Sequence, residues 1–355
     1  MSLTIKETTF SDPSIEKEDL PFVSIIIPVR NEENLIRQCL AAILDQDYPT
    51  TNYEVIMIND HSTDKTVEVI HGFMNACIYK DQIILVNNEG KGVGEARRTG
   101  VKYAKGSVII NYSAHVIATR NYISTLVMKL TNLGKDVAGV GCLFKRLDNS
   151  NPMARNITLA MTSAFGGYGT SHYQSRKEGF VEAITFAAIK KEAIEKIGGY
   201  PAGDDSELNI LLRKFGYKLY NTTETYVYYK FIRARIWDFV IRMIDYGRAR
   251  ASDIKQHPSS FKFIYITPSF FTLLLLLLST IVFIFPKYPF SIIICGLAVI
   301  YLLVDFIASV HIGLKNNFKG FYWLIILFPL MHIGYGLGFL IGLLPRKKRL
   351  VKKRE

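Results

Sequence analysis

Residues 23–33 read VSIIIPVRNEE, and this stretch decides the fold class of the chain. Its first five residues are an apolar run, which predicts a strand buried on both faces, as in a parallel sheet. Pro28 ends the run and a polar cluster follows. From Leu35 to Ile43 apolar residues recur at helical spacing. The stretch therefore predicts a strand, a polar turn and a helix in succession.

The same succession repeats further along the chain. Strand signals alternate with helix signals, which predicts an α/β fold with a doubly wound parallel sheet. The predicted strands are residues 23–27, 53–58, 82–86, 107–111 and 180–189, and the predicted helices are 65–73, 92–104, 190–197 and 208–215. Residues 144–178 are rich in Gly, Ser, Asn and Tyr, and we expect a long loop there.

Polar clusters follow three of the predicted strands. They are Arg30–Glu33, Asp60–Asp64 and Tyr112–His115. Ligands of open α/β sheets bind beyond the carboxyl ends of the strands. The three clusters therefore predict one binding site at this edge of the sheet.

The basic charge of the chain gathers at its C-terminal end. There are 43 Lys and Arg against 31 Asp and Glu, and seven of the basic residues lie in residues 346–354. This run directly follows apolar sequence, so it predicts a juxtamembrane cluster that faces anionic lipid. We expect no nucleic-acid partner, because the sequence has no zinc-finger spacing and no aromatic-basic recognition motif.

The four cysteines are scattered through the chain. They are Cys39, Cys77, Cys142 and Cys295. No pair has metal-site spacing, and we expect reduced structural thiols without a disulfide framework.

Two long apolar segments predict a membrane domain. Residues 263–285 and 290–314 are each long enough to cross a bilayer. The N-terminal residues 1–20 are polar and lack the apolar core of a signal peptide, so we expect the region before residue 263 to stay in the cytosol. Asp305 lies within the second segment, where a carboxylate is either functional or paired near the membrane surface.

A third apolar segment, residues 321–344, leaves two topologies open. A full crossing would place the basic tail outside, against the positive-inside rule. Pro329 and several glycines allow a break, so a re-entrant or interfacial hairpin with a cytosolic tail is the alternative. Residues 232–254 mix aromatic and basic residues and predict a helix in the membrane interface, or else a domain helix with a basic face.

Four ordered motifs resemble those of the family-2 glycosyltransferases over roughly residues 22–250. The motifs are residues 26–33, 59–66, 88–100 and 204–208. Residues 178–182 and 332–338 look most like membrane-attached members that build exopolysaccharides of the succinoglycan type. The resemblance implies the GT-A fold, which is a nucleotide-sugar-binding α/β domain.

The resemblance also assigns the donor site. Glu32 and Asp60 would hold the base and the ribose, with helix capping and an Asx-turn as the alternative roles. Carboxylates at strand ends suit this task, because they accept from a base N–H and from hydroxyls. Lys91 and Arg97 would face the diphosphate. The full set of donor-binding residues is Pro28, Arg30, Glu32, Asp60, Lys91, Arg97, Ser113 and Ala114.

The metal motif of the family, Asp-x-Asp, reads Ser113-Ala114-His115 here. His115 is able to ligate Mn²⁺, whereas Mg²⁺ prefers oxygen ligands. Because the first anionic ligand is missing, we expect a weakened site for Mn²⁺ or Mg²⁺. The same departure keeps open a second hypothesis, a catalytically impaired partner that binds nucleotide or glycan within a polysaccharide assembly.

The acidic pair Asp204-Asp205 stands where the family has its catalytic carboxylates. By resemblance Asp205 is the general base, which deprotonates the acceptor hydroxyl, and a single displacement implies inversion. Asp204 would orient the acceptor. Acidic capping of a helix is the alternative. At lower specificity, Glu182, Arg242 and Tyr246 fall where related synthases contact acceptor or phosphate.

The sequence therefore predicts a membrane-attached, inverting glycosyltransferase of hexosyltransferase type. Its donor is a nucleotide sugar, and its acceptor is a lipid-linked saccharide or polyprenyl phosphate at the cytoplasmic face of the cell membrane. Two or three spans supply too little wall for a translocation channel. The predicted parts are an extension (1–20), a catalytic domain (21–230), an interface helix (231–260), a multi-pass membrane domain (261–345) and a basic tail (346–355).

Overall fold

A computed structural model gives the fold. It describes residues 20–78, 80–146, 152–167, 176–203, 205–229, 235–268, 271, 280, 284, 289–316 and 320–344. The chain divides into two compact units. The first comprises residues 1–148 and 170–231, and the second comprises residues 149–169 and 232–355.

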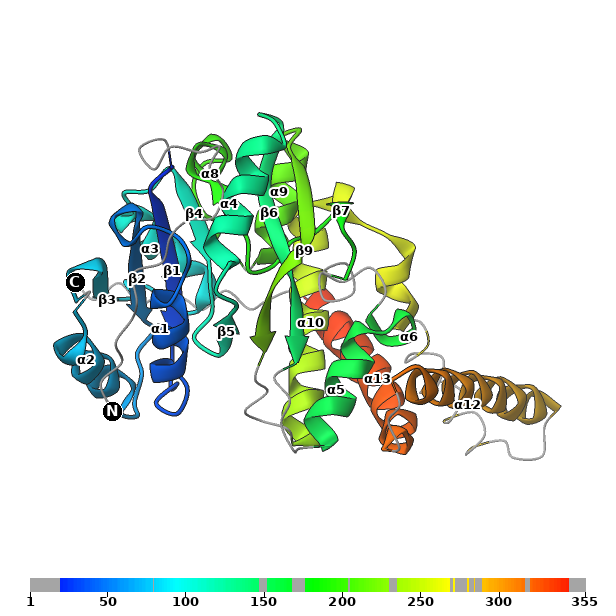
Figure 1. The fold of residues 1–355 in the computed structure, drawn as a ribbon. Coiled ribbons are helices and arrows are strands. Elements are labelled where there is room, and N and C mark those ends of the chain that lie inside the picture. Colours follow the sequence, from blue (N-terminus) through cyan, green and yellow to red (C-terminus); the bar gives the residue numbers. More distant parts are fainter. Residues whose placement is uncertain are drawn as a thin grey trace, which may run out of the picture. The chain divides into compact units, whose positions relative to one another are not determined.

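The first unit is built on a nine-stranded sheet (Figure 1). The strand order is β3-β2-β1-β4-β8-β6-β9-β5, and β7 pairs with β9 outside this path. The strands are β1 (Val23–Val29), β2 (Tyr53–Asn59), β3 (Ile83–Asn87), β4 (Val108–Asn111), β5 (Val116–Ala118), β6 (Val137–Arg146), β7 (Gly179–Val181), β8 (Ala188–Lys190) and β9 (Lys218–Tyr229).

The predicted parallel sheet is confirmed for the first four strands, which pair in parallel. Beyond β4 the sheet is mixed, because β8 runs antiparallel to both of its neighbours. The predicted strand at 180–189 is in fact two short strands, β7 and β8, separated by irregular chain.

Helices cover both faces of the sheet, as the predicted doubly wound arrangement requires. Along β1, Ile25 and Ile27 belong to one apolar core and Ile26 to the other, because successive side chains of a strand point to opposite faces. The helices are α1 (Ile36–Leu44), α2 (Thr66–Ala76), α3 (Val93–Tyr103), α4 (Tyr122–Asn132), α8 (Lys191–Lys196) and α9 (Asp205–Lys214), with short 3₁₀ turns at Thr50–Asn52 and Lys80–Gln82.

The expected long loop at 144–178 is wrong for much of its length. Strand β6 continues to Arg146, and two helices follow, α5 (Pro152–Thr162) and α6 (Ala164–Gly167). Helix α5 buries Ile157 and Met161, which are four residues apart on one face. A Cβ at Gly166 would overlap the carbonyl oxygen of Ala160, so this glycine reflects close packing.

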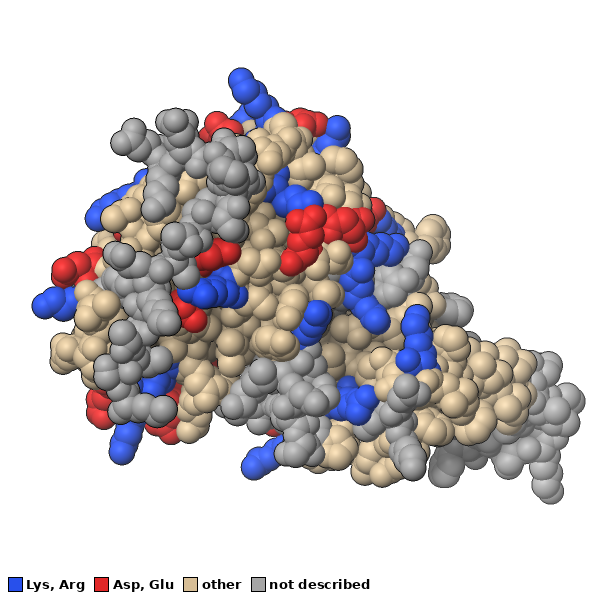
Figure 2. All heavy atoms as spheres, in the orientation of Figure 1, with Lys and Arg blue, Asp and Glu red and all other residues tan. Residues whose placement is uncertain are grey.

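The second unit is helical. Its other helices are α10 (Ile236–Gln256), α12 (Pro289–Lys315) and α13 (Leu324–Leu343), with 3₁₀ turns at Pro258–Ser260 and Phe321–Trp323. Two helical segments, Gly296–Lys315 and Phe321–Leu343, are long and apolar enough to cross a membrane. On the face drawn in Figure 2, the described part of α12 is mostly free of Lys, Arg, Asp and Glu. Most of the first predicted span, residues 263–285, lies outside the described residues.

The sequence left two topologies open for residues 321–344, a full crossing and a hairpin, and helix α13 excludes the hairpin. It runs without a break from Leu324 to Leu343, through Pro329 and its glycines. A hairpin inside this segment is therefore wrong.

Candidate active site

The loops after β1 and β2 are locked together by reciprocal hydrogen bonds. The amide of Asn31 donates to Ser62 Oγ (3.2 Å), and the amide of Thr63 donates back to Asn31 Oδ1 (2.8 Å). One residue further on, the amide of Glu32 donates to Thr66 Oγ1 (2.7 Å). Asn31 adopts a positive φ of 55°, a conformation that Asn tolerates better than most residues. These bonds fix the position from which the Glu32 side chain projects.

Asp64 completes this lock. Its Oδ1 accepts from the amide of Thr66 (3.0 Å), and its Oδ2 accepts from the amide of Glu33 (3.3 Å). In return, the amide of Lys65 donates to Glu33 Oε2 (2.9 Å). Desolvation raises the pKa of Asp64, but these hydrogen bonds outweigh it, and its pKa is lowered overall. Asp64 therefore holds the two loops together as a carboxylate.

Asp60, predicted to hold the ribose, is buried at the end of β2. It accepts from Asn88 Nδ2 (2.8 Å) and from the amide of Gly92 (3.1 Å). Arg30 Nη1 lies 3.6 Å from Asp60 Oδ2. The carboxylate thus links the ends of β1 and β2 to the start of α3. Asn88 was missed, although its place directly after β3 repeats the pattern of a polar residue after a strand.

The N-terminal end of α3 brings the acidic segment to the site. Gly92 precedes the helix with a φ of 93° that favours glycine, and Lys91 beside it is exposed. A Cβ at Gly94 would overlap the carbonyl oxygens of Ala202 and Gly203, so only glycine permits this approach. Asp204, the next residue, lies outside the described residues, and Asp205 begins α9.

Asp205 is held by an ion pair that its sequence position did not predict. Arg97 Nη1 donates to Asp205 Oδ1 at 2.5 Å, and Tyr200 Oη donates to the same oxygen at 3.0 Å. Asn111 Nδ2, at the end of β4, lies 3.5 Å away. The exposed fraction of the Arg97 side chain is 9% and that of Asp205 is 26%. The carboxylate is therefore anchored through Oδ1, and about a quarter of the side chain is exposed to solvent.

The structure gives Arg97 a contact that the sequence did not predict, and its predicted role at the diphosphate stays a prediction. The sequence predicted a cation that faces the diphosphate, whereas the described contact is with the carboxylate of Asp205. Tyr200 and Asn111 were missed as partners of Asp205. Burial raises the pKa of Tyr200 well above its usual range, so its hydroxyl stays protonated and donates. Its place in a Gly-Gly-Tyr-Pro turn gave no signal of this contact.

His115 lies beside Glu32. Its Nδ1 is 3.2 Å from Glu32 Oε1, and its Nε2 is 3.0 Å from Ser113 Oγ. The ring of Tyr229 packs edge-on against the imidazole, with 5.0 Å between ring centroids. Glu32 Oε2 is buried and has no hydrogen-bond partner among the described atoms. The site therefore presents one carboxylate oxygen whose hydrogen-bonding capacity is unused.

These residues fit part of a metal site. Metal-bound histidines generally donate their second ring N–H to a carboxylate, a backbone carbonyl or water, and Glu32 is placed to be such a carboxylate for His115. The Nε2 atom, which here contacts a hydroxyl, would then be the ligand atom. Among the described residues there is no group of three or more His, Cys, Asp or Glu side chains able to hold a metal ion. The diphosphate of a donor would have to supply further ligands.

The remaining predicted residues divide between the two units. Pro28 lies in β1 beside Ile58 of β2, and Ala114 is buried next to Ser113. Glu182 directly follows β7 in the first unit. Arg242 and Tyr246 belong to α10 in the second unit.

Comparison with known proteins identifies the family. Residues 24–198 match the model of glycosyl transferase family 2. A Methanococcus voltae protein is 29% identical over 338 residues, which cover 91% of this chain and 97% of that protein. It is named dolichyl N-acetyl-alpha-D-glucosaminyl phosphate 3-beta-D-2,3-diacetamido-2,3-dideoxy-beta-D-glucuronosyltransferase. The probable glycosyltransferase YdaM of Bacillus subtilis is 30% identical over 57% of this chain and 49% of its own length.

A solved structure shares the fold across both units. The mannosyltransferase PcManGT of Pyrobaculum calidifontis, in complex with GDP-Man and Mn²⁺, has a TM-score of 0.64 at 18% identity. The match covers 92% of this chain and 88% of that one. Together with the family match, it establishes the GT-A fold that the sequence predicted. Residues 24–198 therefore form a glycosyl transferase family 2 domain, and the chain is a glycosyltransferase.

Proposed function

We propose that this glycosyltransferase moves a sugar from a nucleotide-sugar donor to a lipid-linked saccharide or polyprenyl phosphate, with inversion, at the cytoplasmic face of a membrane. The observation that carries the proposal is the anchored Asp205 carboxylate. It is fixed by Arg97 through one oxygen and lies at the strand edge that also presents Glu32 and Asp60. The proposed base and the two proposed donor-binding carboxylates thus lie at the same edge of one sheet.

The donor would bind through the two strand-end carboxylates. Glu32 Oε2 has unused capacity to accept a base N–H. Asp60 would accept from the ribose hydroxyls while it keeps its bonds to Asn88 and Gly92. Lys91, exposed before α3, would neutralise diphosphate charge together with the amide groups of that helix end.

A divalent cation would be held by His115, with Glu32 as the carboxylate that orients its imidazole. When bound, the cation neutralises negative charge on the leaving diphosphate. PcManGT was solved with Mn²⁺, and a nitrogen ligand favours Mn²⁺ over Mg²⁺. Ser113 contributes a hydroxyl where a carboxylate would bind the cation more strongly.

The chemical step is one displacement. The acceptor hydroxyl, or the phosphate oxygen of a polyprenyl phosphate, attacks the anomeric carbon from the face opposite the diphosphate. The bond from that carbon to the diphosphate oxygen breaks, and the nucleoside diphosphate leaves. For a hydroxyl acceptor, the Asp205 carboxylate takes the proton while Arg97 and Tyr200 hold the side chain in place through Oδ1. Asp204 would orient the acceptor.

The lipid-linked acceptor is supported by the relative from Methanococcus voltae, whose name describes a dolichyl-linked acceptor. The two candidate membrane helices support attachment to a bilayer. Glu182, Arg242 and Tyr246 are proposed acceptor or phosphate contacts. If the chain crosses the membrane twice, basic residues 346–354 lie on the side of the catalytic unit and support its cytoplasmic orientation.

Transfer assays on membranes that contain the full chain test this proposal. Radiolabelled nucleotide sugars would be paired with polyprenyl phosphate and with lipid-linked saccharides, and NMR of the product would give the anomeric configuration. Asp136 of the first unit supplies a matched control, because it is also an aspartate paired with a cation, Lys218. We expect transfer by the wild type and by Asp136→Asn, and little by Asp205→Asn.

The impaired-partner hypothesis remains the second candidate, because Ser113 replaces an anionic ligand. It predicts nucleotide binding by calorimetry without transfer from any donor. Equal transfer by wild type and Asp205→Asn would instead remove Asp205 from its proposed role.

A further inference from the structure

Helices α10 and α13 pack in parallel through glycines. A Cβ at Gly338 would overlap the carbonyl oxygen of Ile244, and one at Gly247 would overlap that of Tyr335. Along α13, Gly334 meets Met243, Gly338 meets Ile244, and Gly342 meets Arg248 and Ala251. The contacts advance in the same direction on both helices.

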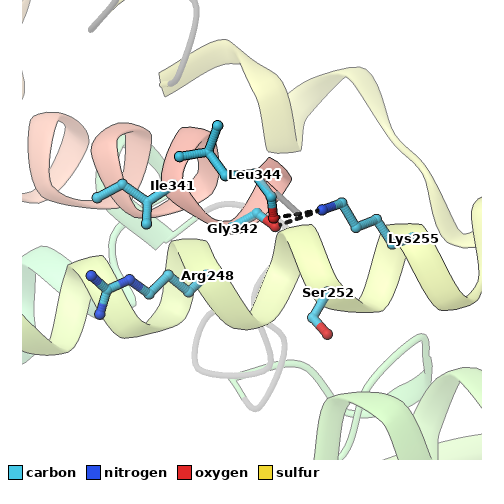
Figure 3. A pocket seen from close by; sticks show the side chains of 6 residues that line it. All are labelled: Arg248, Ser252, Lys255, Ile341, Gly342 and Leu344. Atoms are coloured by element: carbon cyan, nitrogen blue, oxygen red, sulfur yellow. Dashed lines mark hydrogen bonds between the residues drawn. The ribbon is translucent and has the colours of Figure 1, made fainter. Parts of the chain in front are cut away.

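The far end of the pair is closed by a lysine (Figure 3). Lys255 Nζ donates to the carbonyl oxygens of Gly342 (2.9 Å), Leu343 (2.7 Å) and Leu344 (3.3 Å). The last carbonyls of a helix lack partners within the helix and carry partial negative charge, so an ammonium group satisfies and stabilises them. Arg248, Ser252 and Lys255 also line a cavity of about 470 Å³ against the end of α13. Polar side chains of α10 therefore lie against α13 as far as its last turn.

Helix α10 is unsuited to the interior of a bilayer. Charged residues occur along its whole length: Asp238, Arg242, Asp245, Arg248, Arg250, Asp253 and Lys255. Its surface also carries exposed apolar side chains, with Trp237 76% exposed and Ile241 56% exposed. A helix with charged and apolar exposed groups of this kind lies in the membrane interface, and charges at the bilayer centre are costly.

The start of α13 is covered by a different helical segment of the same unit. Phe328 is fully buried, and Phe165 of α6 packs edge-on against it with 4.9 Å between ring centroids. Arg155 of α5 donates to the carbonyl oxygen of Asn316, just before the turn that leads into α13. Of the most apolar 18-residue stretch of the α13 segment, 44% is buried within the protein. The corresponding value for α12 is 17%. Helix α12 is thus the one whose surface is left for lipid.

From these contacts we infer that α13 does not cross the bilayer but lies with α10 in the interface of the leaflet that faces the catalytic unit. Two parallel helices in backbone contact have nearly the same tilt, so α13 cannot cross the bilayer unless α10 also enters the apolar interior, for which its charges make it unsuited. The predicted span 263–285 and helix α12 then form the two crossings. Two crossings return the basic tail to the side of the catalytic unit, in agreement with the positive-inside rule.

Sidedness of labelling tests this topology on the full chain in its membrane, independently of transfer activity. In a Cys77→Ser background, an impermeant maleimide would be applied to intact cells and to inverted vesicles. Three single variants report on three places: Lys105→Cys on the catalytic unit, Lys287→Cys in the segment between the predicted crossings, and Glu355→Cys at the tail. We expect Lys105→Cys and Glu355→Cys to react from one side, and Lys287→Cys from the other.

If Glu355→Cys reacts from the same side as Lys287→Cys, α13 crosses the membrane. If all three variants react from one side, the two proposed crossings do not exist. Both outcomes overturn the inference. Depth provides a second measurement, with a fluorophore at Ile333→Cys of α13 and a matched probe at Leu303→Cys, which is exposed on α12. Lipids brominated deep in their chains should quench the α12 probe strongly and the α13 probe several-fold less, whereas equal deep quenching contradicts an interfacial α13.

Discussion

Arg97 and Asp205, 108 residues apart in the chain, form an ion pair of 2.5 Å between the second turn of α3 and the first residue of α9. The guanidinium is nearly buried and the carboxylate is partly exposed. This asymmetry fits a positioning role for the arginine, since it holds the carboxylate through Oδ1 while part of the Asp205 side chain stays exposed.

The first prediction concerns this pair. Asp205→Asn keeps the shape of the side chain but removes its capacity to take a proton, so transfer should fall about 10²- to 10⁴-fold in kcat. Arg97→Met should also lower kcat, whereas Arg97→Lys keeps the charge and should restore part of it. Steady-state transfer assays and calorimetry with a nucleoside diphosphate would measure both effects. Loss of nucleotide binding in Asp205→Asn would point to a role in the donor site instead.

Glu32→Gln tests the donor cradle. Glutamine lacks the charge that strengthens a hydrogen bond to a base N–H, and it also weakens the contact with His115. A bond to a charged group contributes about 1.5–3 kcal/mol, so the donor KM should rise about 10- to 100-fold. Glu89→Gln is the matched control, because Glu89 is an exposed glutamate paired with Lys102. An unchanged donor KM in Glu32→Gln would leave this carboxylate with a structural role only.

Much of the sheet and part of the site could be predicted from local sequence. The apolar run of β1 and the polar residues that follow three strands carry their own signal, because strand ends at one edge meet in space. The partner of Asp205 could not be predicted, since it depends on how α3 and α9 approach. That approach is set by Gly94 against residues 202–203, a contact between segments about 100 residues apart.

Helix α5 illustrates a second limit of the sequence. Its core side chains have helical spacing, but the surrounding residues are rich in Gly, Ser and Asn. Because this composition is typical of loops, the helix was not predicted. The parallel packing of α13 on α10 was likewise hidden, because apolar composition is the same in a spanning helix and in one buried against protein. Only the backbone contacts at Gly338 and Gly247 distinguish the two.

Ser113→Asp should strengthen metal binding. The added carboxylate would stand beside His115 and supply the anionic oxygen that the motif lacks. With a nucleoside diphosphate present, the Mn²⁺ concentration for half-saturation should fall by about tenfold or more, equivalent to ~1.4 kcal/mol. Electron paramagnetic resonance of free Mn²⁺ would measure this, with Ser113→Ala as the control. Equal Mn²⁺ binding by both variants would place the metal away from residue 113.

The hydrogen bonds that Asp64 accepts from the amides of Glu33 and Thr66 predict a stability effect that depends on pH. Its folded-state pKa lies below the usual value of 3.8. Its stabilisation is therefore present above pH 3.8 and is lost as pH falls through the lower folded-state pKa. Asp64→Asn should lower the Tm of the first unit at pH 7, and the gap to wild type should narrow below pH 3.8. Circular dichroism in detergent would follow this, and the exposed Asp81→Asn should show no such gap at either pH.

Glycine packing between α10 and α13 gives the last prediction. A leucine at Gly338 would drive its side chain into the backbone of Ile244, so the helices must separate or bend. Overpacking of this kind typically costs about 1–3 kcal/mol and should lower the Tm in detergent. Gly296→Leu on α12 is the matched control, since nothing lies within 4 Å of a Cβ built there. Both variants add the same apolar side chain to an apolar helix. A drop confined to Gly338→Leu therefore reports the α10–α13 contact, and equal Tm values would mean that the two helices are not in backbone contact in the detergent-solubilised protein.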